Sequence, residues 1–188
     1  FSSTFSVDGS YYYVGGNTGT AIAGFSVDAA SGVLTLLPGS PFAAGATNVL
    51  AYATDSSGRL FSVDSVDAIR VFISSSGALS PVNGNPFISG LTQRRFGLMH
   101  HNQNFYIVAG NTGNNVGVFQ ISGTGADATV APVAVSPFPT GATTANTLAL
   151  NHDGTLLFVG NRISRSITKF SFDPATGVLS ANVTQPGN

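Results

Sequence analysis

The sequence of 188 residues contains no cysteine, no tryptophan and no glutamate. The absence of cysteine excludes disulfides, thiolate metal sites and cysteine nucleophiles. Charged residues make up only 8% of the chain, with a net charge of −1, whereas an average soluble domain carries about 25% charged residues. Nothing in this charge favours binding to nucleic acid or to an anionic membrane.

Long apolar runs and common catalytic signatures are also absent. No stretch approaches the ~20 apolar residues that span a bilayer, so we expect no membrane span. There is no G-x-S-x-G motif and no P-loop, and we expect no cofactor. The chain begins at Phe1 inside an expected strand, which indicates a processed or truncated product. A surface covered by Ser, Thr, Asn and Gly favours an extracytoplasmic or secreted location.

What the sequence does contain is a repeat of three features. An aromatic-rich run is followed by a strand ending in phenylalanine, and in the first three units by a Ser/Asn-Pro-Phe phrase. The runs begin at Tyr11, Leu60, Phe105 and Leu156, the strand phenylalanines are Phe25, Phe72, Phe119 and Phe170, and the phrases end at Phe42, Phe87 and Phe138. A period of about 40–50 residues indicates an array of one supersecondary unit.

Each unit reads as four short strands joined by turns. In the fourth unit, Asp153-Gly154 predicts a tight turn before a continuous apolar run that starts at Leu156. The alternating segment 167–172 and a more polar segment from Leu179 follow. In the other units we expect strands at 4–7, 11–14, 21–27 and 34–37, then 49–53, 60–63, 69–73 and 79–82, then 96–100, 105–108, 116–121 and 130–135.

Four strands per repeat predict an all-β fold, a β-propeller of four four-stranded antiparallel blades. We expect a single array over 1–188, with blades at about 1–42, 48–87, 95–138 and 145–188. Four blades form either a partial ring of a larger propeller or a ring completed by a second copy. Without such a partner, two sheet faces would stay exposed, so a homodimer is an expected partner.

The fourth unit also resembles a known family. The segment from Asn151 to Arg162 and the segment from Ser166 to Leu179 look like a blade of the lactonase-like seven-bladed propellers. That family includes bacterial 6-phosphogluconolactonases and fungal carboxymuconate lactonizing enzymes, and it is similar to surface-layer and YVTN-type propellers. The resemblance implies a possible lactonase or lactonizing activity, which in the family is associated with an acidic residue beside His and Arg. This chain has no glutamate, and most of its aspartates lie in expected turns.

The expected strand directions place a group of polar residues on one face. The connections between second and third strands share that face with the connections between blades, and four of the six arginines fall there. Because guanidinium groups bind carboxylates and phosphates bidentately, we expect a small acidic molecule or a protein partner at this face. The candidate ligand-binding residues are Arg94, Arg95, Arg162, Arg165, Asp64 and Asn111. The alternative is that these arginines are solvated or pair with Asp64 and Asp67.

The histidines predict neither a metal site nor an assigned catalytic residue. His100 and His101 are adjacent on an expected strand and so point to opposite faces. We therefore expect no metal. The favoured function is a non-catalytic binding scaffold, and the alternative is a hydrolase or cycloisomerase acting on a small acidic lactone. In that alternative Arg94, Arg95 or Arg162 would stabilise the oxyanion, and His100 or His101 would be the base.

Overall fold

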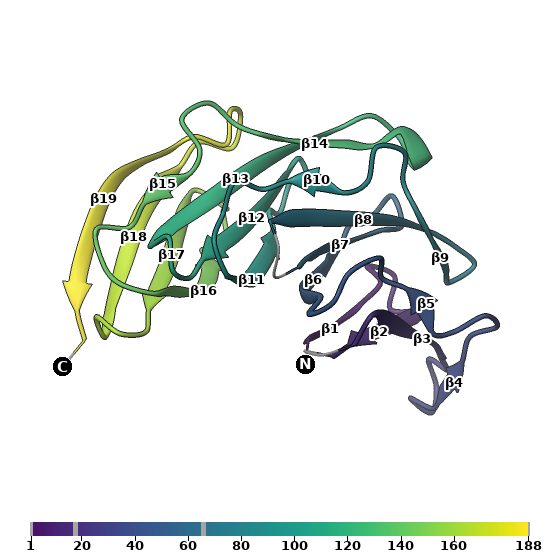
Figure 1. Cartoon of the computed structure of the whole chain (residues 1–188). Helices are drawn as coiled ribbons and strands as arrows, with labels where there is room; N and C mark the ends of the chain where they lie inside the picture. Colours follow the sequence, from purple (N-terminus) through teal and green to yellow (C-terminus); the bar gives the residue numbers. More distant parts are fainter. Residues whose placement is uncertain (1, 17–18, 65–66, 188) are drawn as a thin grey trace.

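The chain folds into four antiparallel sheets arranged in an arc, as the computed structural model shows (Figure 1). The structure describes residues 2–16, 19–64 and 67–187. The first sheet, blade 1, contains β1 (Ser2–Phe5), β2 (Tyr11–Gly15), β3 (Ala21–Val27), β4 (Leu34–Leu36) and β5 (Phe42–Ala43). The second, blade 2, contains β6 (Leu50–Thr54), β7 (Arg59–Val63), β8 (Ala68–Ser75), β9 (Ala78–Pro81) and β10 (Phe87–Ile88).

The other two sheets repeat this arrangement. Blade 3 contains β11 (Arg94–Met99), β12 (Phe105–Gly110), β13 (Asn115–Ser122), β14 (Thr129–Pro132) and β15 (Phe138–Pro139), with a short 3-10 helix at Gly125–Asp127. Blade 4 contains β16 (Ala145–Leu150), β17 (Leu156–Asn161), β18 (Ser166–Phe172) and β19 (Leu179–Pro186). The all-β fold of four blades is therefore confirmed. No helix of the described residues is long and apolar enough to cross a membrane.

The outer edge of the first three blades differs from the expected single fourth strand. The Ser/Asn-Pro-Phe phrases form β5, β10 and β15, which pair with the third strand of their blade. The outer edge of each blade is interrupted between its fourth strand and the short strand of the phrase. There the side chain of the residue before the proline accepts a backbone N–H of the third strand, in place of a strand carbonyl. Ser40 Oγ accepts a hydrogen bond from Gly24 N at 2.9 Å, Asn85 Oδ1 from Val71 N at 2.9 Å and Ser136 Oγ from Val118 N at 3.1 Å. Blade 4 lacks the phrase, and its continuous β19 pairs with β18 from Ser166 to Phe172.

The first strand also starts earlier than expected. The prediction of a strand at 4–7 was wrong, because β1 ends at Phe5, which pairs with Tyr12. Ser6 already belongs to the turn, since its Oγ accepts the Tyr11 N–H at 2.9 Å and donates to Asp8 Oδ1 at 2.6 Å. The polar Ser-x-Asp turn thus sets the end of the strand.

The core lies between the blades in three clusters. Phe72 and Leu60 of blade 2 pack against Tyr13 of blade 1, and corresponding clusters join blade 2 to blade 3 and blade 3 to blade 4. Strands β7 and β12 are buried on both faces, as their continuous apolar runs predict. In contrast, β17 alternates between buried and partly buried residues. The terminal blades therefore have one covered and one open face.

The array of blades has two ends, a loop face and a hairpin face. The loop face is the end that carries the β2–β3, β7–β8, β12–β13 and β17–β18 connections together with the connections between blades. The hairpin face is the opposite end, with the β1–β2, β6–β7, β11–β12 and β16–β17 turns. Backbone hydrogen bonds join the two kinds of connection at the loop face, from Asn111 N to Gln93 O at 3.0 Å and from Arg162 N to Thr144 O at 2.9 Å.

Candidate functional site

Two arginines of the candidate set lie beside a cavity at the loop face of blade 4. The cavity is shallow, encloses about 350 Å³, and is lined by Asn146, Thr147, Gly160, Asn161, Arg162, Arg165, Ser166, Ile167 and Gly187. Arg162 and Arg165 come from the β17–β18 connection, and both side chains are exposed. Among the described residues, neither forms an ion pair. Two cationic groups are thus available to a ligand at the mouth of this cavity.

An unsatisfied amide lies in the wall of the same cavity. Asn161 is only 2% exposed, and its Nδ2 donates to Thr168 Oγ1 at 2.9 Å and to Ser166 Oγ at 3.3 Å. Its Oδ1 is a buried acceptor for which the described residues supply no donor. Buried acceptors are almost always satisfied in native proteins, because leaving one unpaired costs about 1–3 kcal/mol. The wall of the cavity therefore contains one buried acceptor without a donor among the described residues, and this oxygen has almost no exposed surface.

Asn111 joins the cavity indirectly. Its Nδ2 donates to Asn146 Oδ1 at 3.2 Å, and Asn146 lines the cavity at the start of β16. Asn111 itself is buried. Asn111 therefore positions Asn146, a residue that was not predicted from the sequence.

Asp64 is placed by the structure in a different role. Its Oδ2 accepts a hydrogen bond from Arg70 Nε at 3.0 Å and its Oδ1 accepts one from Ala68 N at 3.1 Å, and the residue is buried. Within its own blade the β7–β8 register brings Arg70 to Asp64, and the alternative pairing of Asp64 with Arg94 or Arg95 involves side chains outside the described residues. Asp67 Oδ1 accepts hydrogen bonds from Ser89 Oγ and Leu91 N. Both aspartates hold the loops of blade 2 in place.

Arg94 and Arg95 cannot be assigned a contact. Their backbone begins β11, where Arg94 pairs with Gly110 at the loop face. Their side chains lie outside the described residues, as does Asn17 in the β2–β3 connection.

The histidines lie at the hairpin face, away from the arginine cavity. His100 is buried, stacks on Phe172 at a centroid distance of 4.4 Å, and its Nε2 lies 2.9 Å from Gly154 O. His101 Nδ1 lies 3.0 Å from His152 O. These histidines hold the turns of blades 3 and 4 together, and this explains their conspicuous pairing in the sequence.

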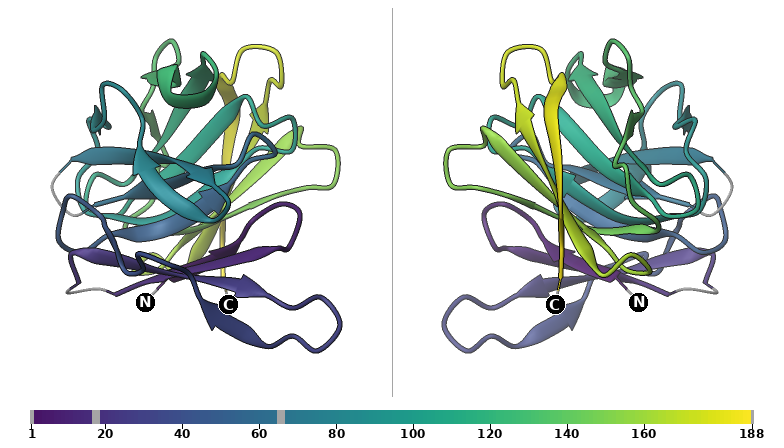
Figure 2. Two further views of the ribbon diagram at one scale, coloured as in Figure 1. Left: turned by 90° about the vertical axis from the view of Figure 1, so that its right-hand side faces the viewer. Right: turned by 90° about the vertical axis from the view of Figure 1, so that its left-hand side faces the viewer.

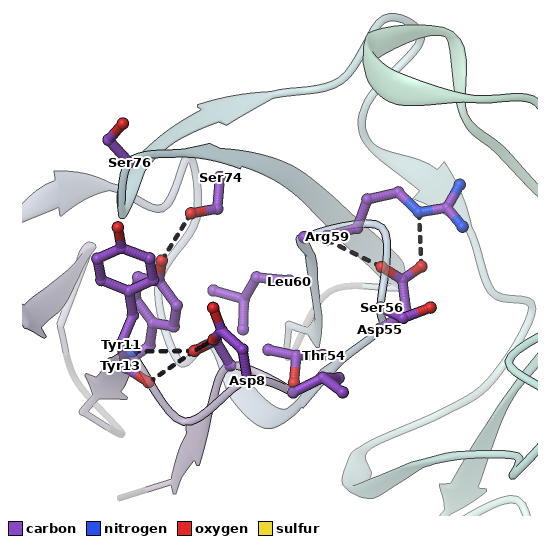
Figure 3. A pocket seen from close by; sticks show the side chains of 13 residues that line it. Asp8, Tyr11, Tyr13, Thr54, Asp55, Ser56, Arg59, Leu60, Ser74 and Ser76 are labelled. Carbon is purple, nitrogen blue, oxygen red and sulfur yellow. Dashed lines mark hydrogen bonds and ion pairs between the residues drawn. The ribbon is translucent and has the colours of Figure 1, made fainter. Parts of the chain in front are cut away.

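A second cavity of about 410 Å³ lies at the hairpin face between blades 1 and 2 (Figure 3). Blade 1 supplies Asp8, Tyr11 and Tyr13, and blade 2 supplies Asp55 and Arg59 among others. Arg59 Nε donates to Asp55 Oδ2 at 2.6 Å, and Tyr13 Oη donates to Gly77 O at 3.0 Å. Hydrogen bonds from the Ser6 hydroxyl, and then from Ser10, lower the pKa of Asp8, whereas burial raises the pKa of Tyr13.

The two cavities differ in how their polar groups are satisfied. In the larger one the Arg59 charge is paired, and Asp8 and Tyr13 have hydrogen-bond partners within the protein. In the smaller one two guanidinium groups and one amide oxygen lack such partners among the described residues. The smaller cavity of blade 4 is therefore the better candidate site.

Fold and comparisons agree on the class of protein. The four blades define a β-propeller, and residues 51–187 match the family model described as "Lactonase, 7-bladed beta-propeller". The chain belongs to this lactonase propeller family. The resemblance of this sequence to the lactonase-like propeller family is thereby confirmed. A search among curated proteins found no match.

Two solved structures of the same fold are each nearly twice as long as this chain. A protein of Bacteroides fragilis, described as a proposed 6-phosphogluconolactonase, superimposes with a TM-score of 0.79 at 16% identity, covering 96% of this chain and 52% of its own. The periplasmic gluconolactonase of Pseudomonas aeruginosa gives a TM-score of 0.76 at 21% identity, with 98% and 56% covered. At these identities the likeness shows the fold alone. The chain spans about half the length of these relatives.

Proposed function

We propose that this chain is a binding scaffold, and that it holds a small hydroxylated carboxylic acid in the loop-face cavity of blade 4. The observation that carries the proposal is the pair of unpaired guanidinium groups, Arg162 and Arg165, beside the unsatisfied Oδ1 of Asn161. A ligand carboxylate would accept charge-assisted hydrogen bonds from the arginines. A ligand hydroxyl would donate to Asn161 Oδ1 once the cavity wall shifts to expose this buried oxygen, and a carboxylate alone cannot donate.

The chemistry of a relative supports this ligand class. Opening of gluconolactone, on which the Pseudomonas relative is named to act, yields gluconate, a carboxylate bearing several hydroxyls. Binding rather than catalysis is favoured because lactone opening needs a base beside the reacting water. Among the described residues, the histidines lie at the opposite face, and Asp64 and Asp67 have their carboxylates engaged by Arg70, Ser89 and Leu91.

Isothermal titration with D-gluconate tests the site. Loss of a hydrogen bond to a charged group costs about 1.5–3 kcal/mol, and about 1.4 kcal/mol is tenfold in affinity. Arg162→Ala and Arg165→Ala should therefore each raise the dissociation constant about tenfold or more. Lys169→Ala is the matched control, because it removes the same charge from an exposed position outside the cavity.

Ligand analogues separate the two halves of the site. Sorbitol lacks the carboxylate and should not bind, and hexanoate lacks the hydroxyls and should bind more weakly than gluconate. Gluconate affinity that is unchanged in the double arginine variant, or reduced equally by Lys169→Ala, would show that the site is elsewhere.

The second candidate function is a lactonase, favoured by family membership. In that case Arg162 or Arg165 would stabilise the oxyanion formed when water attacks the lactone carbonyl. The base would have to come from outside the described residues or from a part of the ring that this chain does not supply. Turnover of a lactone distinguishes the two candidates.

An extracytoplasmic location is part of the proposal. It is supported by the 8% charged residues of the chain and by the periplasmic name of one relative. Fractionation of the source cell tests it, and recovery in the cytoplasmic fraction would contradict it.

A further inference from the structure

We propose that the hairpin-face cavity between blades 1 and 2 binds a small aromatic amine. The cavity encloses about 410 Å³ and is lined by residues of both blades, which lie side by side in both views of Figure 2. The arginine cavity of blade 4 lies at the loop face, at the other end of the array. The amine site is therefore separate from the proposed acid site and does not depend on it.

The repeat identifies the side chains that occupy the corresponding space between other pairs of blades. One comes from the first turn of the earlier blade, where a backbone N–H donates to the first residue of the next strand. The residues at this turn position are Ser6, Asp55 and His100. The other comes from the third strand of the later blade, two residues beyond its buried phenylalanine. The residues at this strand position are Ser74, Ile121 and Phe172.

Between blades 3 and 4 the two positions hold a stacked pair of rings. His100 lies over Phe172 with the ring centroids 4.4 Å apart and the planes inclined by 15°. Between blades 1 and 2 both positions hold serines, Ser6 and Ser74, and both serines line the cavity. The cavity therefore takes the place of a stacked ring pair.

Between blades 2 and 3 the same two positions are filled in another way. Asp55 pairs with Arg59, whose Nη1 donates to Gly123 O of blade 3 at 3.3 Å. Ile121, at the strand position, is buried. The contact between blades 1 and 2 thus differs from both of its counterparts in having two small side chains at this level.

The wall of the cavity is suited to an aromatic ring. Tyr13 Oη donates to Gly77 O at 3.0 Å and lies 2.9 Å from Ser74 Oγ, as Figure 3 shows for the serine. The Tyr11 ring packs so closely on blade 2 that a Cβ at Gly77 would lie 2.7 Å from it. Leu60 adds an aliphatic surface. Because aromatic rings favour stacked or edge-to-face contact with a second ring, these fixed tyrosines offer a preformed surface to a ring.

The charge of the cavity favours an amine over an acid. Arg59 and Asp55 neutralise each other, since Arg59 Nε lies 2.6 Å from Asp55 Oδ2. Asp8 is exposed, lines the cavity, and forms no ion pair among the described residues. Hydrogen bonds from Ser6 Oγ and Ser10 N to its Oδ1 fix the carboxylate in place. A ligand ammonium group would pair with this carboxylate and would also be attracted to the tyrosine rings.

Titration with 2-phenylethylamine, followed by amide chemical shifts of the labelled protein, tests the site. Binding should saturate and should shift the amides of the β1–β2 and β6–β7 turns. Ethylamine lacks the ring and should not bind detectably. 2-Phenylethanol keeps the ring but lacks the charge, and it should bind about twofold to fivefold more weakly, the range for an exposed ion pair. No saturable binding, or shifts confined to blades 3 and 4, would overturn the proposal.

Ser74→Phe tests the position of the ligand. It gives blade 2 the ring that blade 4 carries at Phe172, and the filled cavity should no longer bind 2-phenylethylamine. Ser75→Phe is the matched control, because Ser75 is exposed and lies outside the cavity lining, so that binding should be unchanged. Circular dichroism confirms that both variants are folded. Undiminished binding by folded Ser74→Phe would contradict the site.

Asp8→Asn tests the charge without filling the cavity. Asparagine keeps the oxygen that accepts the turn hydrogen bonds, so the variant should fold and should raise the dissociation constant for 2-phenylethylamine about twofold to fivefold. Asp28→Asn is the matched control, since Asp28 is an exposed aspartate that accepts the Ala30 and Ser31 N–H groups outside the cavity. Equal effects of the two variants would overturn the role of Asp8 and with it the preference for an amine.

Discussion

Replacing Phe119 by alanine should lower the free energy of unfolding by about 3–5 kcal/mol, the range for a fully buried phenylalanine. Phe119 is 0% exposed and lies in the cluster between blades 2 and 3, near Tyr106 and Phe61. The cavity left behind would be bounded by strands that are buried on both faces and cannot collapse easily. Urea denaturation followed by circular dichroism measures the change.

Phe25→Ala is the matched control for this substitution. Phe25 holds the same repeat position, but it lies on the open face of blade 1 and is only partly buried. Its substitution should therefore cost clearly less than that of Phe119. Equal losses would contradict the lower burial of Phe25 in this structure.

Replacing Asp55 by asparagine should also destabilise the fold strongly, by about 3–5 kcal/mol, because it leaves a buried charge without its partner. The ion pair joins Arg59 Nε to Asp55 Oδ2 at 2.6 Å, and both side chains are buried. Asparagine preserves the turn itself, because Asn151 of blade 4 accepts the Leu156 N–H through Oδ1, just as Asp55 accepts the Arg59 N–H. The loss of stability should therefore come from the unpaired charge of Arg59.

The double variant Asp55→Asn/Arg59→Met isolates that cause. Removing both charges should recover most of the stability, since a buried ion pair is often replaced by apolar groups at little cost. Urea denaturation midpoints of the two variants give the comparison. A double variant as unstable as Asp55→Asn would show that the turn, and not the unpaired arginine, is responsible.

The blades could be predicted from the sequence because their signals are local. Turn dipeptides such as Asp153-Gly154 and the recurring aromatic runs mark strand ends without reference to distant residues. The role of Ser40, Asn85 and Ser136 could not be predicted, because each side chain accepts a backbone N–H from a strand more than ten residues away. Only the position of the Ser/Asn-Pro-Phe phrase was visible.

The candidate site was predicted in part for the same reason. Arg162 and Arg165 follow directly from strand order, because alternating strands place their connection at the loop face. The contact of Asp64 with Arg70 was not predicted, since it depends on the β7–β8 register. Asn146 and Asn161 were missed because a polar residue at a strand end has no local signal of its role, although Asn161 directly precedes Arg162 in the segment that resembles the family.

Hydrolysis of D-glucono-1,5-lactone, followed by pH-stat and corrected for the spontaneous rate, tests whether the protein binds without catalysis. The protein should leave this rate unchanged at concentrations that bind gluconate. A rate that rises in proportion to protein concentration and falls in the Arg162→Ala/Arg165→Ala variant would contradict it, and would establish the same cavity as a lactonase active site.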